Sequence, residues 1–415
     1  MRKLLFENFN FTADGGAIKW NGKYGTLKNC NFINNAAGVG GAIYWNGANG
    51  NLTTSTFTNN TAQEGGCILW NGINGILSNS NFANNTARGS AAGIWWSGAN
   101  GILTDSIFTN NSVRSGNAGG IYWLGSNGFI SNSKFINNTA QLNGGAIAWN
   151  GNNGILSNSN FTNNIIRLGN GGAVYWTGNN SKLINSNFIN NVGKTSGGAV
   201  NWNGANGSLI DSNFINNNAG NGGAVNWNGA NGTLINCNFT SNHANSDGAG
   251  VRWGGENGTI IGSTFTNNNA NRDGGAIFWS GTNGILIDST FIKNTANNGG
   301  GVCWIANGEI NNSTFSENTA YLTGGGAVYW YYVIGSINNC NFINSNWTHS
   351  NSKSNGIYAN NNLNINGGKG ILDLVTNSTI LGISIIVLNN ETYYYPPNSN
   401  INLTKKKKNM SYQNI

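Results

Sequence analysis

The sequence predicts an all-β protein built as a solenoid of stacked coils, and three observations lead to this prediction. Glycine occupies 63 of the 415 positions and asparagine is also abundant, a composition that disfavours helices. A tryptophan-containing segment of 25–27 residues recurs thirteen times along the chain. Within each copy the apolar side chains alternate with period 2, as they do in a β-strand with one buried face.

Composition excludes several other classes of protein. Collagen needs glycine at every third position with abundant proline, and this chain has two prolines. Typical disordered chains are charged and poor in aromatics, whereas here 8% of residues are charged and 11% are aromatic. Without the tail lysines Lys405–Lys408, 16 basic residues face 13 acidic ones, so the net charge falls from +7 to +3. We therefore expect no basic stripe in the body and no nucleic-acid partner.

The tryptophans define the repeat: Trp20, Trp45, Trp70, Trp96, Trp123, Trp149, Trp176, Trp202, Trp227, Trp253, Trp279, Trp304 and Trp330. Each copy reads approximately G-G-A-I-x-W-N-G-x-N-G-x-L-x-x-S-x-F-x-N-N-T-A. The interval from Trp to the following Phe is 12 residues in twelve copies and 11 in one, whereas the interval from Phe to the next Trp varies between 13 and 15. Since insertions in a solenoid fall in a loop on one face, the segment before the Gly–Gly pair is predicted to be a variable loop.

Each copy is predicted to form one coil of a parallel β-helix, with three short strands and three bends. Ile277 and Trp279 share a face, and the residue before each Trp is predicted to be exposed because its identity varies widely. Asn–Gly pairs such as Asn74–Gly75 are predicted to supply turns with positive φ. Stacking places the apolar residues in interior ladders and the Asn of F-x-x-N in a hydrogen-bonded ladder. Charges are scarce because each would face its own copy.

The five cysteines are predicted to be isolated replacements of small or variable residues. Cys30, Cys237 and Cys340 stand where other copies carry Ser, Cys67 replaces an Ala, and Cys303 occupies the variable position before a Trp. Their odd number and wide spacing match no zinc motif.

The alternating G-G-A-I and F-x-x-N motifs resemble the repeats of chlamydial polymorphic membrane proteins. The fuller pattern, G-G-A-[IV]-x-W-N-G-x-N-G with F-x-N-N-T-A in an Asn-rich chain, resembles the adhesin-like surface proteins of methanogenic archaea. The resemblance covers about 80% of the chain. It implies a right-handed, single-stranded parallel β-helix of the pectin-lyase type, an extracellular or cell-surface location, an adhesive role and no catalytic residues.

The repeat ends near residue 345, and three parts are predicted. Residues 1–345 form the parallel β-helix of about thirteen coils, residues 346–404 form a cap and short C-terminal β segment, and residues 405–415 form a basic tail. In the adhesin-like proteins such a segment leads into a stalk domain. The apolar run Ile380–Leu388 is too short for a membrane span, and Met1–Phe6 lacks the apolar stretch of a signal peptide. We therefore expect the chain to be a piece of a longer secreted protein.

A pectin-lyase-type fold raises the alternative of an enzyme, which would need clustered carboxylates. One repeat position, three residues before Phe, carries carboxylates several coils apart: Asp105, Asp211 and Asp288. A second position, just before the Gly motif, carries Asp14, Glu64, Asp247 and Asp273. Asp247 and Asp273 fall in adjacent coils, with Arg252 and Arg272 close in sequence. A solvated ion-pair cluster is favoured there over a calcium or catalytic site, so no catalytic, cofactor-binding or metal-binding residue is assigned.

The favoured function is a non-catalytic, cell-surface adhesin-like rod that attaches to glycans or proteins of host or neighbouring cells. Aromatic residues before Trp could stack on sugars or pack on proteins: Tyr44, Tyr122, Tyr175, Phe278 and Tyr329. The alternatives are a lyase or hydrolase acting on polysaccharides and a purely structural fragment. If the protein is exported, asparagines in N-x-[ST] sequons could carry glycans, among them Asn51, Asn59, Asn84, Asn110, Asn137, Asn206, Asn231 and Asn257.

Overall fold

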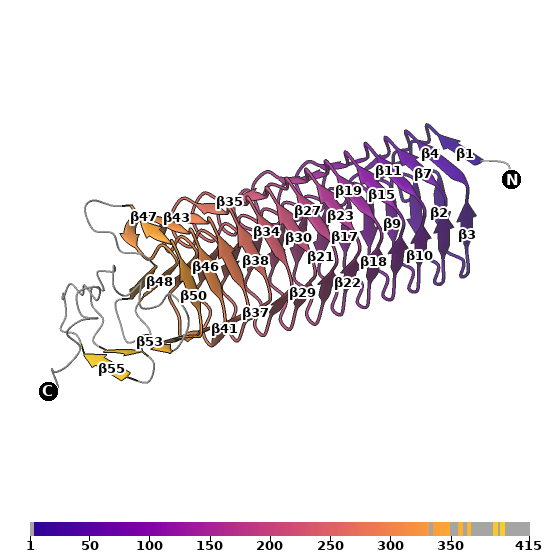
Figure 1. Cartoon of the computed structure of the whole chain (residues 1–415). Coiled ribbons are helices and arrows are strands. Elements are labelled where there is room, and N and C mark those ends of the chain that lie inside the picture. Colours follow the sequence, from indigo (N-terminus) through magenta and orange to yellow (C-terminus); the bar gives the residue numbers. More distant parts are fainter. Residues whose placement is uncertain are drawn as a thin grey trace. The chain divides into compact units, whose positions relative to one another are not determined.

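A computed structural model describes residues 4–331, 335–348, 356–359, 363–366, 385–388 and 391–394, which form strands and turns without a helix (Figure 1). The described part of the chain therefore contains no helix that could span a bilayer. The chain divides into two compact units, Met1–Gly220 and Asn221–Ile415, with eight and five of the repeated tryptophans. Each unit is a parallel β-solenoid, and the predicted all-β parallel β-helix of about thirteen coils is confirmed.

Three parallel sheets run along the first unit. The Trp sheet contains β2 (Ile18–Trp20), β5 (Ile43–Trp45), β9 (Ile68–Trp70), β13 (Ile94–Trp96), β17 (Ile121–Trp123), β21 (Ile147–Trp149), β25 (Val174–Trp176) and β28 (Val200–Trp202). The Leu sheet contains β3 (Thr26–Lys28), β6 (Asn51–Thr53), β10 (Ile76–Ser78), β14 (Ile102–Thr104), β18 (Phe129–Ser131), β22 (Ile155–Ser157), β26 (Lys182–Ile184) and β29 (Ser208–Ile210). The Phe sheet contains β1 (Leu4–Glu7), β4 (Cys30–Ile33), β7 (Thr56–Thr58), β11 (Asn81–Ala83), β15 (Ile107–Thr109), β19 (Lys134–Ile136), β23 (Asn160–Thr162), β27 (Asn187–Ile189) and β30 (Asn213–Ile215).

The second unit repeats the three sheets. Its Trp sheet contains β32 (Val225–Trp227), β36 (Val251–Trp253), β40 (Ile277–Trp279), β44 (Val302–Trp304), β48 (Val328–Trp330) and β52 (Ile357–Ala359). Its Leu sheet contains β33 (Thr233–Ile235), β37 (Thr259–Ile261), β41 (Gly284–Ile287), β45 (Gly308–Asn311), β49 (Gly335–Asn338) and β53 (Leu363–Asn366). Its Phe sheet contains β34 (Asn238–Thr240), β38 (Thr264–Thr266), β42 (Thr290–Ile292), β46 (Thr314–Ser316) and β50 (Asn341–Ile343).

Many coils contain a fourth, very short strand that the three-strand prediction missed. It lies at the start of the variable loop, just after the F-x-x-N segment, where most copies read T-A or N-A, and it is usually two residues long. In the first unit these strands are β8 (Thr61–Ala62), β12 (Thr86–Ala87), β16 (Ser112–Val113), β20 (Thr139–Ala140), β24 (Ile165–Ile166) and β31 (Asn218–Ala219). In the second they are β35 (His243–Ala244), β39 (Asn269–Ala270), β43 (Thr295–Asn298), β47 (Thr319–Gly324) and β51 (Asn346–Trp347).

Stacking in register produces the predicted apolar ladders. The rings of the repeat tryptophans and phenylalanines stack coil upon coil, with centroid separations in the first unit of 4.5–5.2 Å for Trp and 4.5–4.9 Å for Phe. Twelve of these tryptophans are among the largest fully buried side chains. The ladder spacing equals the spacing of paired β-strands, so each ring lies flat on its copy in the next coil.

The last Asn of F-x-x-N forms the predicted polar ladder inside the solenoid. Asn138 is fully buried, and its amide nitrogen donates to Asn164 Oδ1 at 3.0 Å and to the Phe108 carbonyl at 2.9 Å. Its own Oδ1 accepts from the side chain of Asn111 at 2.9 Å. Every polar atom of this side chain therefore has a partner, which makes its burial tolerable.

The Asn–Gly pairs form turns with positive φ, as predicted. The Asn adopts the positive φ, 55° at Asn74 and 56° at Asn153, whereas the Gly after it does not. A Cβ built on Gly154 would lie 2.6 Å from the Trp149 indole. The glycine is thus required because the tryptophan ring packs directly on its Cα, while the asparagine tolerates the left-handed turn.

All five cysteines are buried and free. Cys30 and Cys237 take over serine positions in a ladder where backbone N–H groups donate to the Ser hydroxyl of the next coil, as Cys30 does to Ser55 at 3.2 Å. Burial raises the pKa of the Cys340 thiol to about 12. They behave as small buried side chains rather than as reactive thiols.

Beyond residue 345, β51, β52 and β53 continue the parallel pairing with β47, β48 and β49. An antiparallel hairpin follows, made of β54 (Ile385–Leu388) and β55 (Glu391–Tyr394). The rest of the predicted C-terminal segment and the basic tail 405–415 lie outside the described residues. The three-part division at residues 345 and 404 stays a prediction.

Candidate functional site: the outer face of the Trp sheet

The residues that precede the repeat tryptophans form one ladder on the outer face of the Trp sheet. We call it the outer ladder; in the first unit it contains Lys19, Tyr44, Leu69, Trp95, Tyr122, Ala148, Tyr175 and Asn201. Its tyrosines are half-buried, and their hydroxyl groups accept hydrogen bonds from asparagines of the next coil. Asn150 donates to Tyr122 and Asn203 donates to Tyr175, both at 3.1 Å. The rings are therefore held in place while part of each remains accessible.

Trp95 belongs to this ladder, although the sequence reasoning did not select it. Its ring meets that of Tyr122 edge to face, with centroids 4.8 Å apart and planes at 84°. Its indole N–H donates to Ser97 Oγ at 2.9 Å. The signal was present in the sequence, since Trp95–Trp96 is a doublet in which the second tryptophan is the repeat residue.

The prediction that this position is exposed is wrong for several residues. Phe278 is only 7% exposed, and Ala148, Cys303 and Asn201 are 1–2% exposed. Small residues are covered because larger neighbours stand one coil away, as Tyr122 and Tyr175 do on either side of Ala148. Phe278 lies under the guanidinium of Arg252, 5.9 Å from the ring centroid. Phe278 is therefore no longer a candidate for contact with a ligand.

Tyr329 of the second unit is half-buried, so the prediction that it is exposed holds only in part. Its ring stacks against that of Tyr331, with centroids 5.5 Å apart. Among the outer-ladder aromatics whose side-chain burial the structure describes, those that keep accessible surface are thus Tyr44, Trp95, Tyr122 and Tyr175 in the first unit and Tyr329 in the second.

The predicted carboxylate position before the Gly motif forms a polar ladder beside the outer ladder. Asp14 pairs with Lys19 at 2.9 Å. Glu64 Oε2 accepts from the backbone N–H of Ser90 at 2.7 Å, and burial raises the pKa of Glu64. These carboxylates serve as local partners within the solenoid wall.

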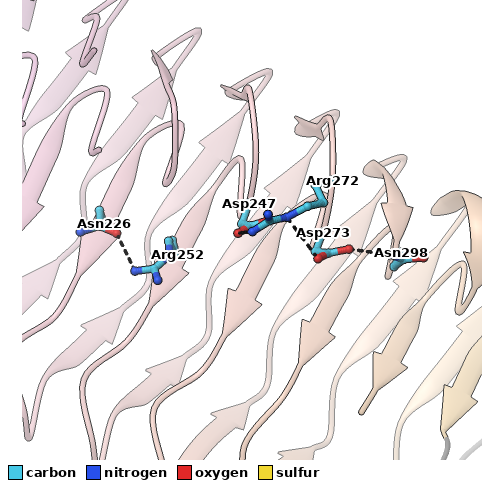
Figure 2. A network of polar contacts seen from close by, with 6 residues as sticks. All are labelled: Asn226, Asp247, Arg252, Arg272, Asp273 and Asn298. Carbon is cyan, nitrogen blue, oxygen red and sulfur yellow. Dashed lines mark hydrogen bonds and ion pairs between the residues drawn. The ribbon is translucent and has the colours of Figure 1, made fainter. Parts of the chain in front are cut away.

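Asp247, Arg272 and Asp273 come together in the second unit (Figure 2). Arg272 Nε donates to Asp247 Oδ1 at 2.7 Å, and its Nη2 donates to the other oxygen of the same carboxylate. Arg272 Nε also lies 3.5 Å from Asp273 Oδ2. Arg252, which was expected in this cluster, instead donates to Asn226 Oδ1 at 3.3 Å. Three of the four predicted residues therefore meet.

The cluster is less solvated than predicted. The side chain of Asp247 is 3% exposed, whereas that of Arg272 is 60% exposed. The hydrogen bond to Asp247 raises the pKa of Arg272, and burial raises the pKa of Asp273, whose Oδ1 accepts from Asn298 at 2.6 Å. With both oxygens of Asp247 held by one guanidinium, the arrangement fits a structural clamp between coils.

Other carboxylates considered for catalysis occupy turns. Asp105, Asp211 and Asp288 are exposed and have φ near 50°, the left-handed conformation that Asn adopts in sister coils. Within the described residues, no three His, Cys, Asp or Glu side chains are grouped so that they could hold a metal ion.

The eight asparagines in N-x-[ST] sequons that were named above are all exposed.

Substitution of the two clustered aspartates should have different effects on the free energy of unfolding. We expect Asp247→Asn to lower the free energy of unfolding by about 1–2 kcal/mol, because the bidentate charge-assisted contact with Arg272 is lost. Asp273→Asn should leave it unchanged or raise it at pH 7, since Asn–Asn pairs occupy this ladder elsewhere, as at Asn117 and Asn143. Urea denaturation of the whole chain measures both.

The pH dependence follows from the raised pKa of Asp273. Its pKa in the folded state lies above that in the unfolded chain, so the folded protein holds the proton more tightly. The resulting contribution to the free energy of unfolding is fully present below the unfolded pKa and is lost as pH rises through the folded pKa. Asp273→Asn should remove that part of the pH dependence. Equal destabilisation by Asp247→Asn and Asp273→Asn would contradict the structural role of this cluster. Loss of ligand binding by a folded variant that carries both substitutions would also contradict it.

Two family models agree with the solenoid. Residues 2–161 match the family described as right handed beta helix region, and residues 262–278 match the Chlamydia polymorphic membrane protein repeat. A surface adhesin of Streptococcus pneumoniae, PfbA, is similar in structure at 11% identity and a TM-score of 0.37, over 87% of this chain and 88% of that one. No curated protein sequence matches this chain.

Proposed function

We propose that the chain is a cell-surface, adhesin-like protein that binds glycans or proteins of host or neighbouring cells without catalysis. The match of residues 262–278 to a repeat of polymorphic membrane proteins supports a place at the cell surface. The right-handed β-helix match over residues 2–161 supports a solenoid in which one coil after another offers the same kind of contact.

The outer ladder of the first unit is the observation that carries this proposal. Trp95, Tyr122 and Tyr175 present partly accessible aromatic surface along one flat sheet, and hydrogen bonds or ring contacts hold each ring in place. Such rings give contact area at little cost in side-chain entropy and suit both sugar faces and apolar protein surfaces. Weak contacts repeated along a rigid surface add up through effective concentration.

A binding test can separate this function from its alternatives. We expect the whole chain to bind at least one member of a glycan or cell array, and the variant Trp95→Ala/Tyr122→Ala/Tyr175→Ala to bind about tenfold or more weakly, because aromatic anchors dominate such contacts. Tyr24→Ala is the matched control, since Tyr24 is a 75% exposed tyrosine outside the outer ladder.

Failure of the whole chain to bind any array member would contradict adhesion and favour the structural alternative. Unchanged binding by the triple variant would show that the ligand binds to a surface other than the outer ladder. Cleavage of a polysaccharide by the whole chain, abolished by Asp247→Asn, would favour the enzyme alternative.

A further inference from the structure

The nearly neutral body of the chain carries a short row of basic residues, although no basic stripe of the kind that nucleic-acid binding needs was expected there. In the first unit, the residue six positions after the repeat Phe is basic in four of five consecutive coils. Counting from Phe82, Phe108, Phe135, Phe161 and Phe188 gives Arg88, Arg114, Gln141, Arg167 and Lys194. We call this row the basic ladder; it follows the short strands β12, β16, β20 and β24.

The strand register confirms that these side chains are stacked. Ala87 pairs with Val113, and Ala140 pairs with Ile166, each one residue before a member of the basic ladder. Ile165 pairs with Val192, two residues before Arg167 and Lys194. With about 4.8 Å between paired strands, the four cations span about 20 Å along the solenoid wall. All four are exposed.

Stacked like charges are unusual in this chain because equivalent residues face each other. At other stacked charges the repulsion is relieved: Lys293 pairs with Glu317 of the next coil at 3.6 Å, and Arg272 bridges Asp247 and Asp273. Among the described residues, no carboxylate forms an ion pair with any of the four cations of the basic ladder. Glu64, which lies in the coil before that of Ser90, accepts from the Ser90 backbone N–H. The basic ladder therefore lacks an internal counter-charge.

An open groove of about 500 Å³ lies at one end of the basic ladder. Arg88 and Arg114 line it together with Phe11, Gln63, Thr61 and Thr86. Phe11 is 56% exposed, and the hydroxyl groups of Thr61 and Thr86 are 2.6 Å apart. Guanidinium groups bind carboxylate or sulfate in bidentate fashion, hydroxyl and amide groups bind sugar hydroxyls, and an aromatic ring can cover a sugar face.

We propose that the basic ladder and this groove bind a linear acidic polysaccharide whose carboxylate or sulfate groups supply the missing counter-charges. The proposal rests on the adhesive function and names its ligand class. A chain of acidic sugars lies along the wall with its charged groups in one row, matching cations that occupy four of five consecutive coils. A nucleic acid fits less well, because the groove has one aromatic side chain and binders of single strands interleave several aromatics with their cations.

Immobilised polymers test this inference with the whole chain. Polygalacturonate carries carboxylates, dextran sulfate carries sulfates, dextran is neutral, and oligo(dT) represents a single-stranded nucleic acid. We expect binding to one of the two acidic polysaccharides, no binding to dextran, and weakening as salt rises, because exposed charges are screened. R88Q/R114Q should weaken binding about tenfold or more, since two charge-assisted contacts are lost.

K134Q/K182Q is the matched control. It removes the same charge from two exposed lysines of the first unit, on β19 and β26 of the Phe and Leu sheets. We expect its affinity to stay within about twofold of the parent, since distant surface charges are largely screened. R88Q/R114Q should not lower the melting temperature, because it relieves repulsion between stacked like charges.

Several outcomes would overturn the proposal. They are equal losses in both double variants, binding to dextran, tighter binding to oligo(dT) than to either acidic polymer, or binding to none of the four. Adhesion to cells is measured in parallel: adhesion without binding to an acidic polymer overturns this inference and leaves the proposed function standing. Binding to an acidic polymer that R88Q/R114Q abolishes, without adhesion to cells, supports the inference and contradicts the adhesive function.

Discussion

Asn138→Asp should destabilise the first unit more than almost any other isosteric change in the chain. The Asn138 amide nitrogen donates to Asn164 Oδ1 and to the Phe108 carbonyl. An Asp carboxylate in its place donates nothing and brings an oxygen against two acceptors. Because the side chain is fully buried, the charge has no access to water. We expect a loss of about 3–5 kcal/mol in the free energy of unfolding at pH 7.

Asn137→Asp provides a control one residue away. Asn137 is exposed and has a φ of 54°, a conformation that Asp adopts at other turns of this chain, such as Asp105. We expect a change below about 0.5 kcal/mol, as for most surface substitutions. Urea unfolding followed by tryptophan fluorescence compares the two variants. Similar stability of both would mean that the Asn ladder contributes little.

The penalty at residue 138 should also depend on pH. Burial raises the pKa of a carboxyl above its unfolded value of about 3.9, so the folded variant binds a proton more tightly than the unfolded chain. The protonated form regains one donor. The deficit of Asn138→Asp relative to the parent should therefore shrink as pH falls from 7 toward 4 and grow as pH rises. A deficit independent of pH would point to a cause other than the buried charge.

The features that recur in every coil, and therefore stack on one another, could be predicted from the sequence. The interior Trp and Phe ladders and the Asn ladder follow from the nearly constant 12-residue interval between Trp and Phe and from the period-2 pattern of apolar residues. The fourth strand was missed because a two-residue strand shows no alternation. The coverage of Phe278 was missed because it depends on Arg252 of the neighbouring coil, and a single copy of the repeat does not contain that information.

The basic ladder shows how the choice of reference residue limits sequence reasoning. Counted back from the following repeat tryptophan, its cations lie eight or nine residues away, because the variable loops differ in length. Counted from the preceding Phe, Arg88, Arg114, Arg167 and Lys194 all fall at the same offset, since the chain is still in register at the short strand. The net charge gave no hint, because it sums over all faces of the molecule.

Glycine after the turn asparagine should be as restrictive as a buried core residue. Gly154 is buried, and an added methyl group would meet the indole of Trp149 at 2.6 Å. The indole cannot move away, since it is stacked between Trp123 and Trp176 with centroids 5.0 and 4.7 Å from its own. We expect Gly154→Ala to cost about 1–3 kcal/mol through overpacking.

A double-mutant cycle distinguishes this close approach from a backbone requirement. Trp149→Ala alone should cost about 3–5 kcal/mol, because it leaves a cavity in the Trp ladder. In that background Gly154→Ala should cost almost nothing, since its methyl group enters the vacated space. The two changes should therefore couple by about 1–3 kcal/mol, as contacting residues do. Additive costs would show instead that Gly154 is needed for its backbone conformation, although Asn153, with a φ of 56°, and not Gly154 adopts the left-handed conformation.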